Sequence, residues 1–288
     1  MSGAVQTGYA PPPSRPDQPA SGRRWLRWLV AATVAWAVLL VGVTWWSVRH
    51  DPPTVKEQRS LDQAGPVVDR AVGRLTAAVG RDGVSAIVPD RIERGCRVTP
   101  LEDGAELARG VEVVIAGDDV RDLLQRVADR LPPSWRAGVA ASADGPVLRA
   151  DAGEFVAVEG RASGPGRVLL TAATGCRPVG AGYRPPTAAA EGESAEATRA
   201  VRRWGGAAGP VQVLAAPCPG GGTARTARAE TAGGPTGSPL AAAFRDAADG
   251  AQVVRDSDDR YALRGGVSIL AERAGDRVRV AVTTPCPG

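Results

Sequence analysis

The chain has 288 residues, with 35 Lys and Arg against 31 Asp and Glu, which gives a formal net charge of +4. A surplus of this size excludes a nucleic-acid binder unless the positive charge is concentrated in one place. The hydrophobic content of 43%, with 36 Gly and 24 Pro, excludes both a wholly disordered chain and a collagen-like one. We therefore expect a folded protein of one or two domains.

Residues 1–24 are predicted to form a disordered cytoplasmic tail. The segment is rich in Pro and shows no apolar periodicity, so it has too little apolar surface to offset the entropy of folding.

Residues 25–48 are predicted to form a transmembrane signal-anchor helix. No formal charge occurs from Trp28 to Val48, and about 20 apolar residues cross the roughly 30 Å hydrocarbon core of a bilayer. Trp25 and Trp28 stand at one end of the segment, and Trp45 and Trp46 at the other, the interfacial positions that indole rings favour.

A cleaved signal peptide is the competing interpretation of this segment. The apolar region of a signal peptide is shorter, about 7–15 residues. An Ala-x-Ala triplet exists at residues 35–37, but it lies inside the apolar run and not after it. The sequence therefore favours an uncleaved anchor.

The flanks of the segment predict its orientation. Arg23, Arg24 and Arg27 precede it, and residues 1–27 hold four Arg against one Asp, whereas residues 49–64 are neutral. The side richer in Lys and Arg stays cytoplasmic. We expect a plasma-membrane location, lipid contact through residues 25–48, the N-terminus inside, and the chain from about residue 49 onward outside.

The outer part is predicted to be two tandem copies of one α+β plan, residues 61–178 and 194–288. A juxtamembrane stalk over 49–60 precedes the copies, and a linker over 179–193 joins them. Each copy gives the order α-β-β-α-β-β-β and ends on a Cys. The last three strands are matched pairwise, at 137–142 with 251–257, 154–162 with 267–274, and 166–176 with 276–286. The matched order predicts a duplication.

Local signals support the helices and strands of both copies. Asp119 is a predicted N-cap for a helix over 120–131, and Pro66 marks the start of the first helix. Ser238 and Pro239 give the same signals before the later helix of the second copy. The weakest predicted strand is 223–231, because few of its residues are strongly apolar.

The chain has four Cys, all after the apolar segment. An even number of Cys in an exported region favours disulfides, with three connectivities open. Duplication selects Cys96–Cys176 and Cys218–Cys286, one bridge inside each copy. Zinc is disfavoured because no Cys-x-x-Cys occurs and the single His, His50, lies beside the membrane segment.

No catalytic residue, metal ligand or cofactor site is predicted. A triad needs a His base near its nucleophile, and a Ser–Lys dyad or Schiff base needs a Lys. His50 and the single Lys, Lys56, both fall in the predicted stalk. Paired carboxylates remain open, because their separation in space is not visible in a sequence.

The layout resembles that of proline-tailed, membrane-anchored envelope proteins of high-GC Gram-positive bacteria, without a family-specific motif. We expect a non-catalytic binding or scaffolding protein of the cell envelope, with an envelope protein or the cell wall as partner and no nucleic acid. An extracytoplasmic hydrolase that uses carboxylates and a ligand sensor are the alternatives.

Overall fold

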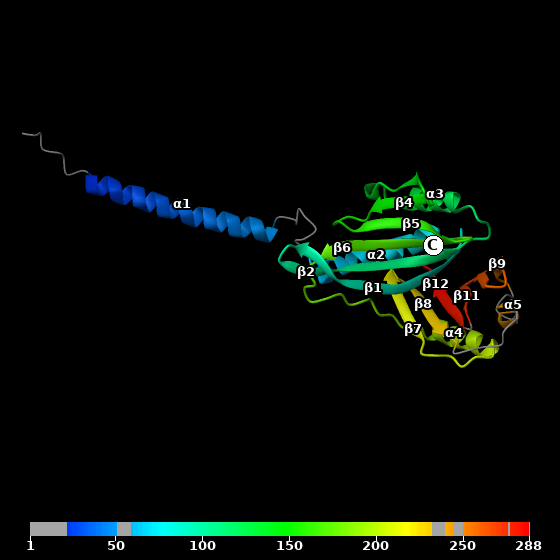
Figure 1. Cartoon of the computed structure of the whole chain (residues 1–288). Helices are drawn as coiled ribbons and strands as arrows, with labels where there is room; N and C mark the ends of the chain where they lie inside the picture. The colour runs from blue at the N-terminus through cyan, green and yellow to red at the C-terminus, as the bar shows by residue number, and fades with distance from the viewer. Residues whose placement is uncertain (1–21, 51–58, 232–239, 245–249, 276, 288) are drawn as a thin grey trace, which may run out of the picture. The chain divides into compact units, whose positions relative to one another are not determined.

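The structure is a computed structural model that describes residues 22–50, 59–231, 240–244, 250–275 and 277–287 (Figure 1). The chain divides into two compact units, residues 1–52 and residues 53–288. The second unit has α+β content and holds two six-stranded antiparallel sheets.

The first unit contains a single described element, the helix α1 (Gly22–His50). Its segment Trp25–Trp46 has a mean hydropathy of 2.0 and exposes its side chains along the whole length. Within the described residues, α1 is the one helix long and apolar enough to cross a membrane, a property that a signal sequence shares. The helix extends beyond the predicted 25–48 at both ends.

The first sheet of the second unit is formed by the chain from residue 84 to residue 177, and its strands lie in the order β1-β2-β6-β5-β4-β3. Its elements are α2 (Leu61–Val79), β1 (Val84–Thr99), β2 (Glu102–Val114), α3 (Val120–Arg130), the 3-10 turn η2 (Pro133–Trp135), β3 (Gly138–Ser142), β4 (Gly145–Asp151), β5 (Ala157–Gly164) and β6 (Arg167–Arg177).

The second sheet is formed by the following part of the chain, with strand order β7-β8-β12-β11-β10-β9. Its elements are α4 (Glu191–Arg203), β7 (Gln212–Pro217), β8 (Thr223–Glu230), α5 (Leu240–Ala243), β9 (Gln252–Asp256), β10 (Arg260–Arg264), β11 (Ser268–Ala274) and β12 (Arg277–Thr284). Within each sheet the strands are therefore arranged first, second, sixth, fifth, fourth and third along the chain. Each sheet has four strands after its second helix and not the predicted three, because β4 and β10, each the second strand of a tight hairpin, were missed.

The boundaries agree with the local sequence signals at some ends and differ at others. Helix α3 has the predicted cap, in which the Asp119 carboxylate accepts the backbone N–H of Asp122 at 3.0 Å. Strand β8 falls in the predicted 223–231. Helix α2 begins at Leu61 and not at Pro66, because the backbone N–H of Ser60 donates to the Gln63 side chain at 3.2 Å, half of a capping box.

A further predicted boundary falls elsewhere. Helix α4 begins at Glu191, inside the predicted linker 179–193. The predicted cap at residues 238–239 lies outside the described residues.

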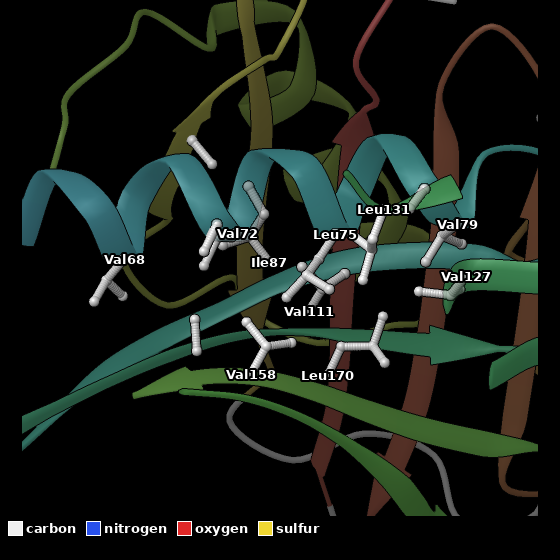
Figure 2. Close-up of a cluster of buried hydrophobic side chains, with 14 of the residues drawn as sticks. Val68, Val72, Leu75, Val79, Ile87, Val111, Val127, Leu131, Val158 and Leu170 are labelled. Carbon is white, nitrogen blue, oxygen red and sulfur yellow. The ribbon is translucent and has the colours of Figure 1, made fainter. Parts of the chain in front are cut away.

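The main core lies between α2, α3 and one face of the first sheet. Figure 2 shows the α2 side chains directed toward the strands that carry Val111, Val158 and Leu170. The α2 side chains Val68, Val72, Leu75 and Val79, spaced four, three and four residues apart, are wholly buried. Burying each such side chain contributes about 1.5–3 kcal/mol to stability, so this face holds the helix on the sheet.

The two sheets share a core. Figure 1 shows the strands of the second sheet running across β1. A small apolar cluster joins the sheets and consists of Val84, Ala86, Val114, Val254, Ala262, Leu270 and Ala281. Side chains of β8 also reach the edge of β1, where the Ile87 N–H donates to Thr226 at 3.0 Å and Arg228 donates to the Ile87 carbonyl at 2.8 Å. These bonds satisfy backbone groups at an unpaired strand edge.

Both Cys pairs are bonded, Cys96 with Cys176 and Cys218 with Cys286. The first bond ties the β1–β2 hairpin to β6. The second packs against α2, where Cys286 Sγ lies 3.5 Å from the Gly73 carbonyl. Gly73 also lets the end of β7 come close to α2, because a Cβ at this position would lie 1.8 Å from the Pro217 carbonyl oxygen.

A buried polar cluster fixes the segment between the sheets. The Asp69 carboxylate of α2 pairs with Arg109 of β2 and accepts the Tyr183 hydroxyl at 2.6 Å. Arg109 also donates to the Ala215 carbonyl of β7 at 2.9 Å. Burial raises the pKa of Asp69, and Tyr183 and Arg109 oppose that shift. The predicted linker is therefore packed at Tyr183, next to Gly65.

Candidate functional site: a charged cleft between the sheets

A cleft of about 330 Å³ opens where the first sheet leaves the face of the second. Its floor is the face of the second sheet that points away from α4. This face carries charge because β12 alternates, with Val278, Val280 and Val282 buried on the α4 side and Arg279 on the other. The charged lining residues are Glu112, Arg228, Glu230, Glu272 and Arg279.

Arg167 joins the two walls of the cleft. Its guanidinium contacts Glu112 of the first sheet and lies 2.7 Å from Glu272 of the second. Arg260 lies 3.5 Å from the same Glu272. On the floor, Arg279 lies 3.6 Å from Glu230. We call these residues, with Arg228, the charged cluster. Its charges come from both sheets and from residues more than 100 positions apart.

The cluster contains more guanidinium donors than it can satisfy. In the described part of the chain, four buried side-chain polar atoms have no hydrogen-bond partner, and three belong to this cluster: Nε of Arg167, Nη2 of Arg228 and Nε of Arg260. The Arg260 side chain is only 6% exposed. A buried donor without an acceptor costs about 1–3 kcal/mol, so an oxygen acceptor placed here would be stabilised.

Arg228 is the cation of this cluster that lines the cleft and has the weakest pairing. Its Nε donates a hydrogen bond to the Ile87 carbonyl. Its Nη2 lies 3.8 Å from a carboxylate oxygen of Glu112. Burial lowers the pKa of Arg228, and the charges of Glu112 and Glu272 oppose this shift. The side chain is still a cation near neutral pH.

In the second unit, two larger hollows offer less to a ligand. One of about 600 Å³ lies between α4 and the β10–β11 turn, but its Glu193 already accepts bonds from Thr284 at 2.6 Å and from Arg225 at 3.0 Å. The other, of about 730 Å³, has Arg264 on its wall, which donates to Gln252. The lining of neither hollow includes a buried atom without a hydrogen-bond partner.

The residues singled out from the sequence lie elsewhere. Arg23, Arg24, Arg27 and the four Trp of the apolar segment all belong to α1, and the four Cys form the two disulfides. None of them lines the cleft. Among the described residues, no group of three or more His, Cys, Asp or Glu could hold a metal ion.

The residues of the cleft were missed by sequence reasoning. The alternation of Val and Arg in β12 indicates one buried and one polar face, and that signal is visible in the sequence. It does not indicate that the polar face is partly covered by another sheet. In comparisons with known proteins, no family model, no curated protein and no solved structure matches this chain.

Proposed function

We propose that this chain is a single-pass, membrane-anchored binding protein of the cell envelope, with its second unit outside the membrane and without catalytic activity. Helix α1 supports the anchor by its length and its apolar surface. The cations in its first turns, Arg23, Arg24 and Arg27, support a cytoplasmic N-terminus. The two disulfides fit an oxidising compartment.

The second unit is proposed to descend from a tandem duplication. The support is the shared strand order of the two sheets and the disulfide inside each copy. The cleft is lined by residues of both sheets, so it would not exist in a single copy.

The cleft is proposed to bind an anionic group, a carboxylate or a phosphate of an envelope partner. The observation that carries this proposal is Nη2 of Arg228, a buried guanidinium atom of the cleft lining without a hydrogen-bond partner, next to the equally unpaired Nε atoms of Arg167 and Arg260. Arginine presents its donors in a planar fork that matches both oxyanions. A hydrolase is the competing proposal, but Glu112 and Glu272 are both paired with Arg167, which suits a structural role better than proton transfer.

Two arginines of β12 provide a matched test. Arg277 and Arg279 are on the same face, are 59% and 55% exposed, and lie at 3.5 and 3.6 Å from Glu230. Only Arg279 lines the cleft. The Arg279→Gln and Arg277→Gln variants of the full chain in detergent are titrated with inorganic phosphate and with succinate, at ionic strength held constant with NaCl. Thermal unfolding reports binding.

We expect at least one anion to raise the Tm of the parent chain at millimolar concentration. Arg279→Gln should weaken that binding about tenfold or more, because a hydrogen bond to a charged group is worth about 1.5–3 kcal/mol. Arg277→Gln should leave it unchanged. The phosphate and succinate arms distinguish the two kinds of oxyanion. Equal behaviour of the two variants, or no shift with either anion, would show that the cleft is not an anion site.

A further inference from the structure

Three exposed apolar side chains lie on segments of the second unit that meet at Arg177. Leu101, in the turn of the β1–β2 hairpin, is 99% exposed, Phe155 is 47% exposed and Val179 is 37% exposed. We call these three residues the apolar end. Isolated exposed apolar residues are common on soluble proteins. These three indicate a binding surface only if the fold holds them in one region.

Arg177 connects the three positions. Its buried guanidinium donates to the carbonyls of Glu154 at 2.7 Å and Phe155 at 3.2 Å. Val179 follows Arg177 by two residues. The hairpin that carries Leu101 passes so close that a Cβ on Gly104 would lie 2.3 Å from the Arg177 carbonyl oxygen. The neighbouring Cys96–Cys176 bond holds the hairpin there.

The backbone at Phe155 has an unfavourable conformation. Glu154 has a φ of 54° and Phe155 a φ of 59°, in the left-handed region that residues other than glycine rarely adopt. Such a conformation persists only where surrounding contacts impose it. The contacts here are the two bonds from Arg177 and the ion pair between Arg59 and Glu154. The chain thus maintains a strained loop that leaves Phe155 half exposed.

The chain also enters the second unit at this end. Arg59 pairs with Glu154, and the Leu61 N–H donates to the Pro178 carbonyl at 2.9 Å, beside Val179. Residues 51–58 separate Arg59 from the end of α1 at His50. At 3.3–3.6 Å per residue they span at most about 30 Å. A membrane crossed by α1 is therefore within reach of the apolar end.

We propose that the apolar end docks on the membrane that α1 crosses, with Leu101 and Phe155 inserted among the lipid headgroups and upper acyl chains. This inference rests on the proposed membrane anchor. Insertion is driven by apolar burial. On the hairpin, Arg97 lies 4.0 Å from Asp103, so these two exposed charges partly offset each other. The docked unit has a fixed face toward the membrane.

The sequence provides two matched probes, because the chain has two Phe. Phe155 belongs to the apolar end, and Phe244 is 1% exposed in the core of the second sheet. The full chain, labelled with fluorophenylalanine, is placed in phosphatidylcholine nanodiscs with or without nitroxide-labelled lipid. We expect the nitroxide to broaden the Phe155 fluorine resonance several times more than that of Phe244. Leu101→Ser should reduce this difference at least twofold.

Val267→Ser is the control, since Val267 is likewise an exposed apolar residue, at 37%, but lies in the β10–β11 turn. It should leave the Phe155 broadening unchanged. Equal broadening of the two resonances in chains that are inserted in discs would overturn the docking and leave the anchor intact. A Leu101→Ser variant that behaves like the parent would also overturn it. A chain that elutes apart from the discs would contradict the anchor itself, and the docking with it.

Discussion

Replacement of Gly73 by Ala tests whether the two sheets are one cooperative structure. Glycine inside a helix is destabilising by about 1 kcal/mol relative to alanine, so helix propensity alone predicts a stabilised protein. The structure predicts the opposite. The added Cβ would lie 1.8 Å from the Pro217 carbonyl oxygen and 2.7 Å from its carbon, where ordinary contacts begin near 3.4 Å.

The magnitude follows from the distance that the helix must move. Relief of the clash requires α2 and the β7–β8 turn to separate by more than about 1 Å, which loosens the packing of Leu214, Ala216 and Cys218 against the first core. Overpacking of this kind costs about 1–3 kcal/mol. At a urea m-value of about 3 kcal/mol/M, the unfolding midpoint should fall by about 0.3–1 M.

The assay is urea unfolding of the full chain in detergent, followed by the fluorine resonances of Phe155 and Phe244. Phe155 reports on the first sheet and Phe244 on the second. Both midpoints should fall together in Gly73→Ala. The matched control is Gly192→Ala in α4, where a Cβ meets nothing within 4 Å, and stability should rise slightly. An unchanged or raised midpoint in Gly73→Ala, or a fall seen by one probe alone, would refute the reasoning.

Three further predictions concern stability. Tyr183→Phe should lower the free energy of unfolding by about 1–3 kcal/mol in urea titrations, because the buried Asp69 carboxylate loses a donor. Leu270→Ala should cost about 2–5 kcal/mol in the same titration, since this buried side chain belongs to the cluster that joins the sheets, and a cost below about 1 kcal/mol would contradict the shared core. Glu193→Gln should flatten the dependence of stability on pH. Although burial opposes ionisation, bonds from Thr284 and Arg225 lower the pKa of Glu193 below 4.5, so its stabilisation is present above about pH 4.5 and lost as the pH falls through the folded-state value. Unfolding free energies measured from pH 3 to 7 would show the same slope in parent and variant if this reasoning is wrong.

Elements specified by neighbouring residues could be predicted from the sequence. The apolar helix α1 needs only a long run without charge, and α3 needs only a stripe of apolar side chains after the Asp119 cap. The start of α2 was misplaced because Pro66 is a strong local signal, and the capping signal of Ser60, six residues earlier, with Gln63 was overlooked. Such interactions act over three or four residues, so a short stretch of sequence is enough to predict them.

The sequence by itself determined where the apolar segment lies, the two Cys pairs, and most of the helices and strands of the second unit, but it missed β4 and β10, so each sheet has six strands where five were predicted. Only the tertiary structure decided that the halves share a core, that the segment around Tyr183 is packed, and that Arg167, Arg228 and Glu272 meet in one cleft. The reason is physical. Periodicity shows which face of a strand is polar, but the partner of that face is fixed by contacts between residues far apart in the chain, and these depend on how complete sheets pack.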